Sequence, residues 1–126
     1  VYSGWWYDTG TKKVYVVNAA LFPPIVAPSG EEGVGAVIYA TKDCADENDR
    51  FIMYLFKYTP EGLDLLHEAM SDDFDLDGPC CAMPANMMLV KTVDEAEWVH
   101  RNWAERQAII DAERAKRGSA YPCYRP

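Results

Sequence analysis

The chain has 126 residues, of which 49% are hydrophobic, 13% aromatic and 25% charged, and its formal net charge at pH 7 is -8. This length fits one domain over residues 1–126, and the composition is too hydrophobic for a disordered chain. The negative charge would repel a polyanion, so we expect no direct binding of nucleic acid. No apolar run reaches the roughly 18 residues that a membrane helix requires, so we expect a soluble, acidic domain without a membrane partner.

The N-terminal part of the chain predicts a β-hairpin followed by a loop. Two stretches rich in Trp, Tyr and Val, residues 4–8 and 12–18, flank a turn that contains Gly10. Residues 21–33 then carry several prolines and glycines, which interrupt the hydrogen bonding of a strand. We therefore expect residues 21–33 to form a proline-rich loop without regular structure.

Two longer apolar runs, residues 34–41 and 51–58, predict a second hairpin with an acidic turn over residues 43–49. Alternate residues of a strand point to opposite faces of the sheet. By this alternation one face of the second run carries Phe51, Met53 and Leu55, and the other carries Ile52, Tyr54, Phe56 and Tyr58. Both faces of the sheet are thus apolar, and both need a cover.

A short helix is predicted after the second hairpin. Thr59, Pro60 and Glu61 provide an N-cap, a proline at the first helical position and an acid in the first turn. The helix is expected to run to about Met70. Residues 87–91 then predict a last strand, which the chain would reach through a β-α-β crossover.

A long helix is predicted from a capping box formed by Thr92 and Glu95, and it is expected to end at Gly118 after Arg117. Two ion pairs at a spacing of four residues would support it, Glu97 with Arg101 and Glu113 with Arg117. Residues 119–126 are expected to be an extended tail. A helix over this range would place one apolar stripe against the sheet, formed by Ala96, Val99, Trp103 and Ile110.

Trp98 and Ile109 would lie together on nearly the opposite side of that helix. The predicted fold is α+β, a mostly antiparallel sheet of four or five strands with one short and one long helix packed on one face. Such a fold has more apolar surface than it can bury. Trp98 and Ile109 are therefore candidate contacts for a protein partner, most simply a second copy of the chain in a homodimer.

The aromatic sheet face allows two functional hypotheses. In the first, the chain is a non-catalytic binding or assembly module that self-associates through this face or through the Trp98 and Ile109 patch. In the second, the chain is a small-molecule-binding protein or an enzyme, with a pocket for a small apolar ligand between this face and the proline-rich loop. The candidate residues on the face are Tyr54, Phe56, Tyr58 and Trp6.

Asp73, Asp75 and Asp77, followed by Gly78, resemble the opening half of an EF-hand calcium loop. The resemblance implies calcium held by these three carboxylates. Pro84 stands at the twelfth position, where the full pattern has a bidentate Glu. The alternative is a solvated acidic turn that stops the preceding helix.

Cys44, Cys80, Cys81 and Cys123 contain no CxxC pair. We expect buried thiols in a cytoplasmic protein; if the protein is secreted instead, a disulfide would join Cys80 or Cys81 to Cys44 or Cys123. His67 and His100 lie in no catalytic motif, and no phosphate-binding glycine loop is present. The sequence therefore predicts no reaction and identifies no catalytic residue.

Overall fold

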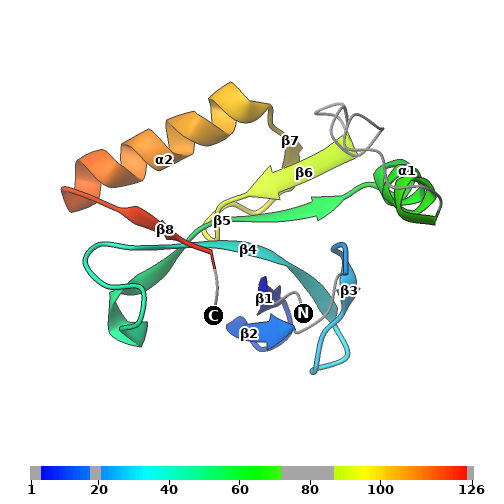
Figure 1. Ribbon diagram of the computed structural model, residues 1–126, viewed down its shortest axis with the longest axis horizontal. Helices are drawn as coiled ribbons and strands as arrows, with labels where there is room; N and C mark the ends of the chain where they lie inside the picture. The colour runs from blue at the N-terminus through cyan, green and yellow to red at the C-terminus, as the bar shows by residue number, and fades with distance from the viewer. Residues whose placement is uncertain (1–3, 18–20, 72–86, 125–126) are drawn as a thin grey trace.

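The computed structural model describes residues 4–17, 21–71 and 87–124. These residues form an open antiparallel sheet of eight strands with two α-helices, as Figure 1 shows. The α+β prediction is confirmed. The sheet has more strands than the four or five expected, because three segments of only two or three residues also pair with its longer strands.

The strands in chain order are β1 (Gly4–Asp8), β2 (Lys13–Val17), β3 (Ile25–Val26), β4 (Glu32–Ala40), β5 (Arg50–Tyr58), β6 (Met88–Lys91), β7 (Val99–His100) and β8 (Tyr121–Cys123). The helices are α1 (Pro60–Ser71) and α2 (Trp103–Arg117), and the short 3-10 helix η1 (Glu47–Asp49) precedes β5. The order across the sheet is β2-β1-β4-β5-β6-β7, and β3 and β8 also pair with β4. Neither helix in this part of the chain is long and apolar enough to cross a membrane.

Both predicted hairpins are present, β1 with β2 and β4 with β5. The proline-rich loop is less irregular than expected, since β3 pairs with the start of β4. Asp8 holds this loop against the first hairpin: its carboxylate is only 3% exposed and accepts hydrogen bonds from the Gly10 amide, the Ser29 amide and the Ser29 hydroxyl. The Ser29 hydroxyl, ahead of the backbone amides, lowers the pKa of Asp8.

The predicted β-α-β crossover is wrong, because β6 runs antiparallel to β5. The chain returns to the sheet beside the point where β5 ends: the Thr59 amide donates to the Met87 carbonyl over 2.9 Å. A Cβ on Gly62 of α1 would lie 2.7 Å from the same carbonyl, so α1 approaches Met87 closely. A strand that starts where its neighbour ends has to run back along it.

The predicted long helix begins at Trp103, well after Thr92. The Thr92 amide does donate to the Glu95 carboxylate, but the chain then turns instead of coiling. Arg101 binds that carboxylate at 2.6 and 2.9 Å and also donates to the Val90 carbonyl, which returns the chain to β6 as β7. The predicted Glu97–Arg101 pair is therefore wrong, whereas the Glu113–Arg117 pair is present at 3.0 Å.

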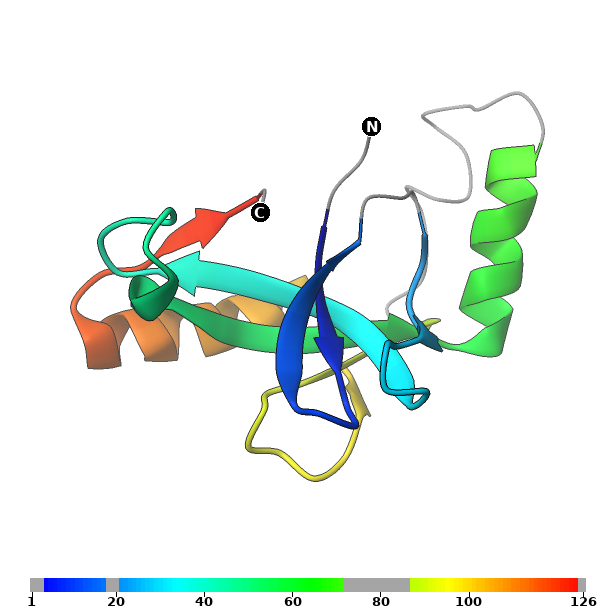
Figure 2. The ribbon, with the colours of Figure 1, turned by 90° about the horizontal axis from the view of Figure 1, so that it is seen from below.

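The capping box that opens α2 is formed by Asn102 and Glu105, each of which binds the backbone amide of the other. Gly118 ends the helix with φ of 88°, as the sequence predicts for a residue after a helix. The two helices do not lie together on one face: α2 runs along the sheet, while α1 stands beside its end (Figures 1 and 2).

The sheet separates two apolar clusters, and a β-bulge decides which residues enter each. Along β4 and β5 the register passes from Val37 opposite Tyr54 to Ile38 opposite Ile52, which leaves Met53 without a partner. The bulge shifts the alternation by one residue. Leu55 therefore packs with Ile52, and the prediction that it shares a face with Phe51 and Met53 is wrong.

We call the two sides of the sheet the closed face and the pocket face. The closed face is built on Val34, Ile38, Leu55 and Tyr7, and Trp98 packs against it from the segment between β6 and β7. The pocket face carries Tyr39, Tyr54, Phe56 and Val90, and α2 packs on it through Ile109 and Ile110. Figure 2 shows the β1–β2 hairpin rotated steeply against β4 and β5, so that the sheet curls.

Candidate functional site

A cavity of about 640 Å³ lies mainly on the pocket face, and Ala36, Ile38 and Cys123 of the closed-face cluster also border it. It is bordered by β1, β4 and β5 of the sheet, by α2, by residues 21–23 of the proline-rich loop and by residues 122–124 at the end of β8. Pockets that hold small organic ligands commonly have volumes of roughly 300 to 1,000 Å³. The cavity is thus large enough for such a ligand.

The floor of the cavity is a row of cross-strand neighbours. Trp6 of β1 lies opposite Gly35 of β4, which lies opposite Phe56 of β5. A Cβ on Gly35 would collide with the Cε1 and Cζ atoms of Phe56, so the ring extends over the glycine. The absence of a side chain at position 35 is what allows the Phe56 ring to lie across β4.

The wall beside this floor is made of interlocked aromatic rings. The centroid of Tyr58 lies 6.2 Å from that of Phe56 and 6.3 Å from that of Phe22, and both pairs are nearly perpendicular, at 81° and 83°. Edge-to-face pairs of this kind are favourable and hold rings at fixed angles. Phe22 belongs to the proline-rich loop, so the rings connect the loop to the sheet.

The mouth of the cavity carries exposed aromatic side chains. Trp103, the first residue of α2, is 62% exposed, and Tyr124, which follows β8, is 81% exposed. Both line the cavity. Ile110, which is buried and lies further along α2 than Trp103, lines it too. An apolar molecule that enters the cavity would cover part of both exposed rings.

The described lining of the cavity contains no charged side chain. Its polar groups include the phenol hydroxyls of Tyr39, Tyr54, Tyr58 and Tyr124. Burial raises the pKa of Tyr39, with a smaller opposing effect of Arg114, so this phenol is neutral at physiological pH. The lining can therefore offer apolar contact and a few neutral hydrogen bonds.

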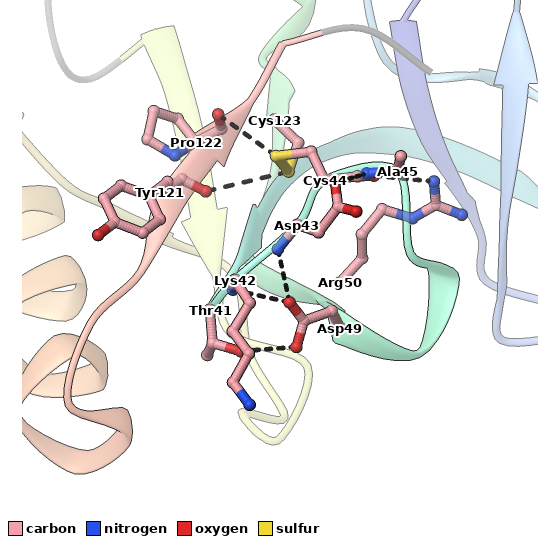
Figure 3. Close-up of a disulfide and its surroundings, with 10 residues drawn as sticks. All are labelled: Thr41, Lys42, Asp43, Cys44, Ala45, Asp49, Arg50, Tyr121, Pro122 and Cys123. Carbon is pink, nitrogen blue, oxygen red and sulfur yellow. Dashed lines mark hydrogen bonds between the residues drawn. A yellow bond between two sulfur atoms is a disulfide. The ribbon is translucent and has the colours of Figure 1, made fainter.

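A disulfide holds the C-terminal wall of the cavity. Cys44 is bonded to Cys123 with a Cα–Cα distance of 5.7 Å, and Figure 3 shows the bridge joining the β4–β5 loop to β8. The expectation of free thiols is wrong for these two residues, as is the expectation that Cys80 or Cys81 would supply one partner. The loop brings Cys44 to the edge of β4 on which β8 pairs, which the spacing in the sequence does not reveal.

Asp49 shapes the loop that presents Cys44. Its carboxylate accepts hydrogen bonds of 2.7 Å from the Thr41 hydroxyl and from the amides of Lys42 and Asp43 (Figure 3). The Thr41 hydroxyl is the main cause of the lowered pKa of Asp49. The acidic turn predicted here is therefore an ordered loop around one carboxylate.

The structure brings four of the predicted binding residues to one place. Trp6, Tyr54, Phe56 and Tyr58 all line the cavity. The other two do not join them. Trp98 lies on the closed face, with the Nζ atoms of Lys57 and Lys91 at 4.6 and 5.5 Å from its ring centroid. Ile109 belongs to α2 and packs from it against the pocket face. The predicted patch of Trp98 and Ile109 does not form, since Trp98 precedes the helix.

The predicted calcium ligands Asp73, Asp75 and Asp77, like Cys80 and Cys81, lie outside the described residues. Within residues 4–17, 21–71 and 87–124, no group of three or more His, Cys, Asp or Glu side chains is placed to hold a metal. His67 is exposed, with its ring centroid 6.1 Å from that of Phe22, and His100 is exposed on β7.

Sequence reasoning missed Gly35, Pro122 and Tyr124 as lining residues. A glycine inside a run of strand-forming residues is a known sign of close approach by another group, and Gly35 carries that sign. Pro122 and Tyr124 belong to the predicted tail, and only the pairing of β8 with β4 brings them to the cavity.

Comparisons with protein-family models, with curated proteins and with solved structures found no match for this chain. The functional argument therefore depends on the geometry of the cavity.

Proposed function

We propose that this chain is a non-catalytic binding domain that holds a largely apolar small molecule in the cavity of the pocket face. The observation that supports it is the cavity of about 640 Å³, lined by aromatic side chains from six separate segments and by no charged group. Burial of apolar surface would drive binding, and the tyrosine hydroxyls would orient the ligand.

The cavity favours this function over self-association. The patch of Trp98 and Ile109 that would have formed a homodimer contact is absent, and α2 already packs on the aromatic face through Ile110. It also favours binding over catalysis. Cys123, the one cysteine among the lining residues, is bonded to Cys44 and offers no thiolate. Calcium binding at Asp73, Asp75 and Asp77 stays a prediction.

The disulfide bears on the compartment in which the domain works. Structural disulfides persist in oxidising compartments and are rare in the cytoplasm. The Cys44–Cys123 bridge therefore supports an oxidising compartment in place of the cytoplasmic location expected from the sequence. Peptide mapping of protein from its native source would test this, and recovery of both cysteines as free thiols would contradict it.

A fluorescent probe tests the proposed function. N-phenyl-1-naphthylamine is uncharged and apolar, and its emission rises on transfer from water to an apolar site. We expect saturable binding with one site per chain. Val37→Trp would fill the cavity from β4 and weaken binding by at least about tenfold, or about 1.4 kcal/mol.

The matched control is Val16→Trp, which adds the same side chain at an exposed position of β2 outside the cavity. This variant is expected to bind the probe like the parent protein. Circular dichroism would verify that both variants are folded. No saturable binding to the parent protein, or unchanged binding to a folded Val37→Trp variant, would refute the proposed function.

A further inference from the structure

One face of α2 combines residues of the cavity with two arginines. Trp103, Arg106, Ile110 and Arg114 follow one another at spacings of three and four residues, which places them on one face of the helix. Trp103 and Ile110 line the cavity. Arg106 thus lies on α2 between two residues that touch the cavity.

Arg106 has no anionic partner among the described residues. Its guanidinium carbon lies 5.3 Å from the centroid of the Trp103 ring, and its Nε atom is buried without a hydrogen-bond partner in the described structure. The four ion pairs found there leave it out. A buried donor without an acceptor is costly, and it is the more unexpected in a chain with 20 acidic and 12 basic residues.

Other arginines of this region are satisfied within the chain. Arg101 binds the Glu95 carboxylate and Arg117 binds the Glu113 carboxylate. Arg114 lies 5.9 Å from the ring centroid of Tyr39, another residue of the lining, and its Nε donates to the Ala120 carbonyl. Arg106 is the one of the four whose buried Nε has no acceptor among the described residues.

We propose that the ligand of the cavity is amphipathic, with an apolar body inside the cavity and one carboxylate that pairs with Arg106 at the mouth. The inference rests on the proposed function and deepens it by naming the class of ligand, a monocarboxylic acid with an aliphatic or aromatic body. A guanidinium group matches a carboxylate with two parallel hydrogen bonds, and Nε is one of the donors used. Arg106 is half-buried and does not itself line the cavity, so its side chain would turn toward the mouth to give the closed-off Nε its acceptor.

Two compounds with the same alkyl chain distinguish the contribution of the carboxylate to binding from that of the apolar body. Decanoate and 1-decanol carry the same alkyl chain, and each can be titrated against bound N-phenyl-1-naphthylamine to obtain its dissociation constant. We expect decanoate to bind at least about tenfold more tightly than decanol, the range of one charge-assisted hydrogen-bonded pair. Arg106→Gln is expected to remove this preference and leave the affinity for decanol unchanged.

Two further variants control for charge and for folding. Lys116→Gln removes one positive charge from an exposed position of the same helix and is expected to keep the preference for decanoate. Arg106→Lys keeps the charge but loses the planar pair of donors, and it is expected to keep part of the preference. Circular dichroism would establish that each variant is folded.

The outcomes distinguish the inference from the proposed function. Equal affinity of the parent protein for decanoate and decanol, or an unchanged preference in a folded Arg106→Gln variant, would overturn the role of Arg106. Displacement of the probe by decanol in the same experiments would still support an apolar pocket. Failure of both compounds to displace the probe, together with probe binding that ignores Val37→Trp, would refute the pocket itself.

Discussion

The closed face and the pocket face are two sides of the same strands, yet the cavity is bordered mainly by the side chains of the pocket face. On the closed face Val34 is fully buried at 0% exposed, and Leu55 packs in the same cluster. On the pocket face Gly35 and Val37 border about 640 Å³ of space. The closed face is built mainly on aliphatic side chains, whereas the part of the pocket face that borders the cavity carries the edge-to-face pair of Phe56 and Tyr58.

The difference teaches that an excess of apolar residues does not by itself predict an assembly surface. Phe56 and Tyr58 are held nearly perpendicular to each other, and both line the cavity instead of filling it. The apolar surplus of this sequence is therefore divided between a packed layer and the lining of a cavity.

The largest difference is expected from the same substitution on the two faces of β4. Val34→Ala removes two methyl groups from a fully packed site and should lower the free energy of unfolding by about 2 to 3 kcal/mol. Val37→Ala removes them beside existing space and should cost about 0.5 kcal/mol. Urea denaturation measures both, and equal losses would mean that the faces are packed alike.

A smaller loss is expected when the floor of the cavity is overfilled. Gly35→Ala would push its methyl group into the Phe56 ring, and overpacking of this kind costs about 1 to 2 kcal/mol. Phe56→Leu in the same chain removes the ring and should recover part of the loss. A double variant in which the two losses simply add would show that the ring does not lie over the glycine.

The smallest effect concerns the segment that carries Trp98 onto the closed face. Arg101, followed by the Thr92 amide, lowers the pKa of Glu95 from 4.5 to about 2. Because the folded-state pKa lies below the ordinary value, the stabilisation is complete above pH 4.5 and is lost as the pH falls through about 2. The Glu95 side chain is 35% exposed, so solvent screening limits the stabilisation to about 1 kcal/mol.

Glu95→Gln should therefore lower the free energy of unfolding by about 1 kcal/mol at pH 7, and the difference from the parent protein should close between pH 4.5 and 2. Glu97→Gln is the matched control, since the exposed Glu97 forms no ion pair among the described residues. Urea denaturation across this pH range measures both. A difference that stays constant down to pH 2 would argue against the Arg101 contact.

Local signals in the sequence were sufficient for the longer elements. The alternating runs of β4 and β5, the Pro60 start of α1 and the end of α2 at Gly118 each follow from residues that are close in sequence. The three short strands do not, because a segment of two or three residues becomes a strand only through the partner against which it lies. The predicted start of the long helix at Thr92 and Glu95 was wrong because Arg101 also binds the Glu95 carboxylate and the chain turns there.

The candidate site was predicted only in part, because local signals in the sequence group some of its residues and not others. Tyr54, Phe56 and Tyr58 share a face by simple alternation, so their grouping was visible in the sequence, but the bulge at Met53 places Ile52, predicted to share that face, on the other side with Leu55. Arg106 was not visible as a site residue. Its meaning comes from the missing acceptor at Nε, which only the folded structure can show.

The disulfide divides the chain into an open arm and a covalently closed ring. The ring runs from Cys44 to Cys123, a separation of 79 residues, and includes Tyr54, Phe56 and α2. Trp6 and Gly35 precede Cys44 and therefore lie in the arm, outside the ring. The cavity therefore lies between the arm and the ring, and the arm can separate from the ring without the breaking of a covalent bond. A single backbone cleavage inside the ring would leave both fragments joined by the disulfide.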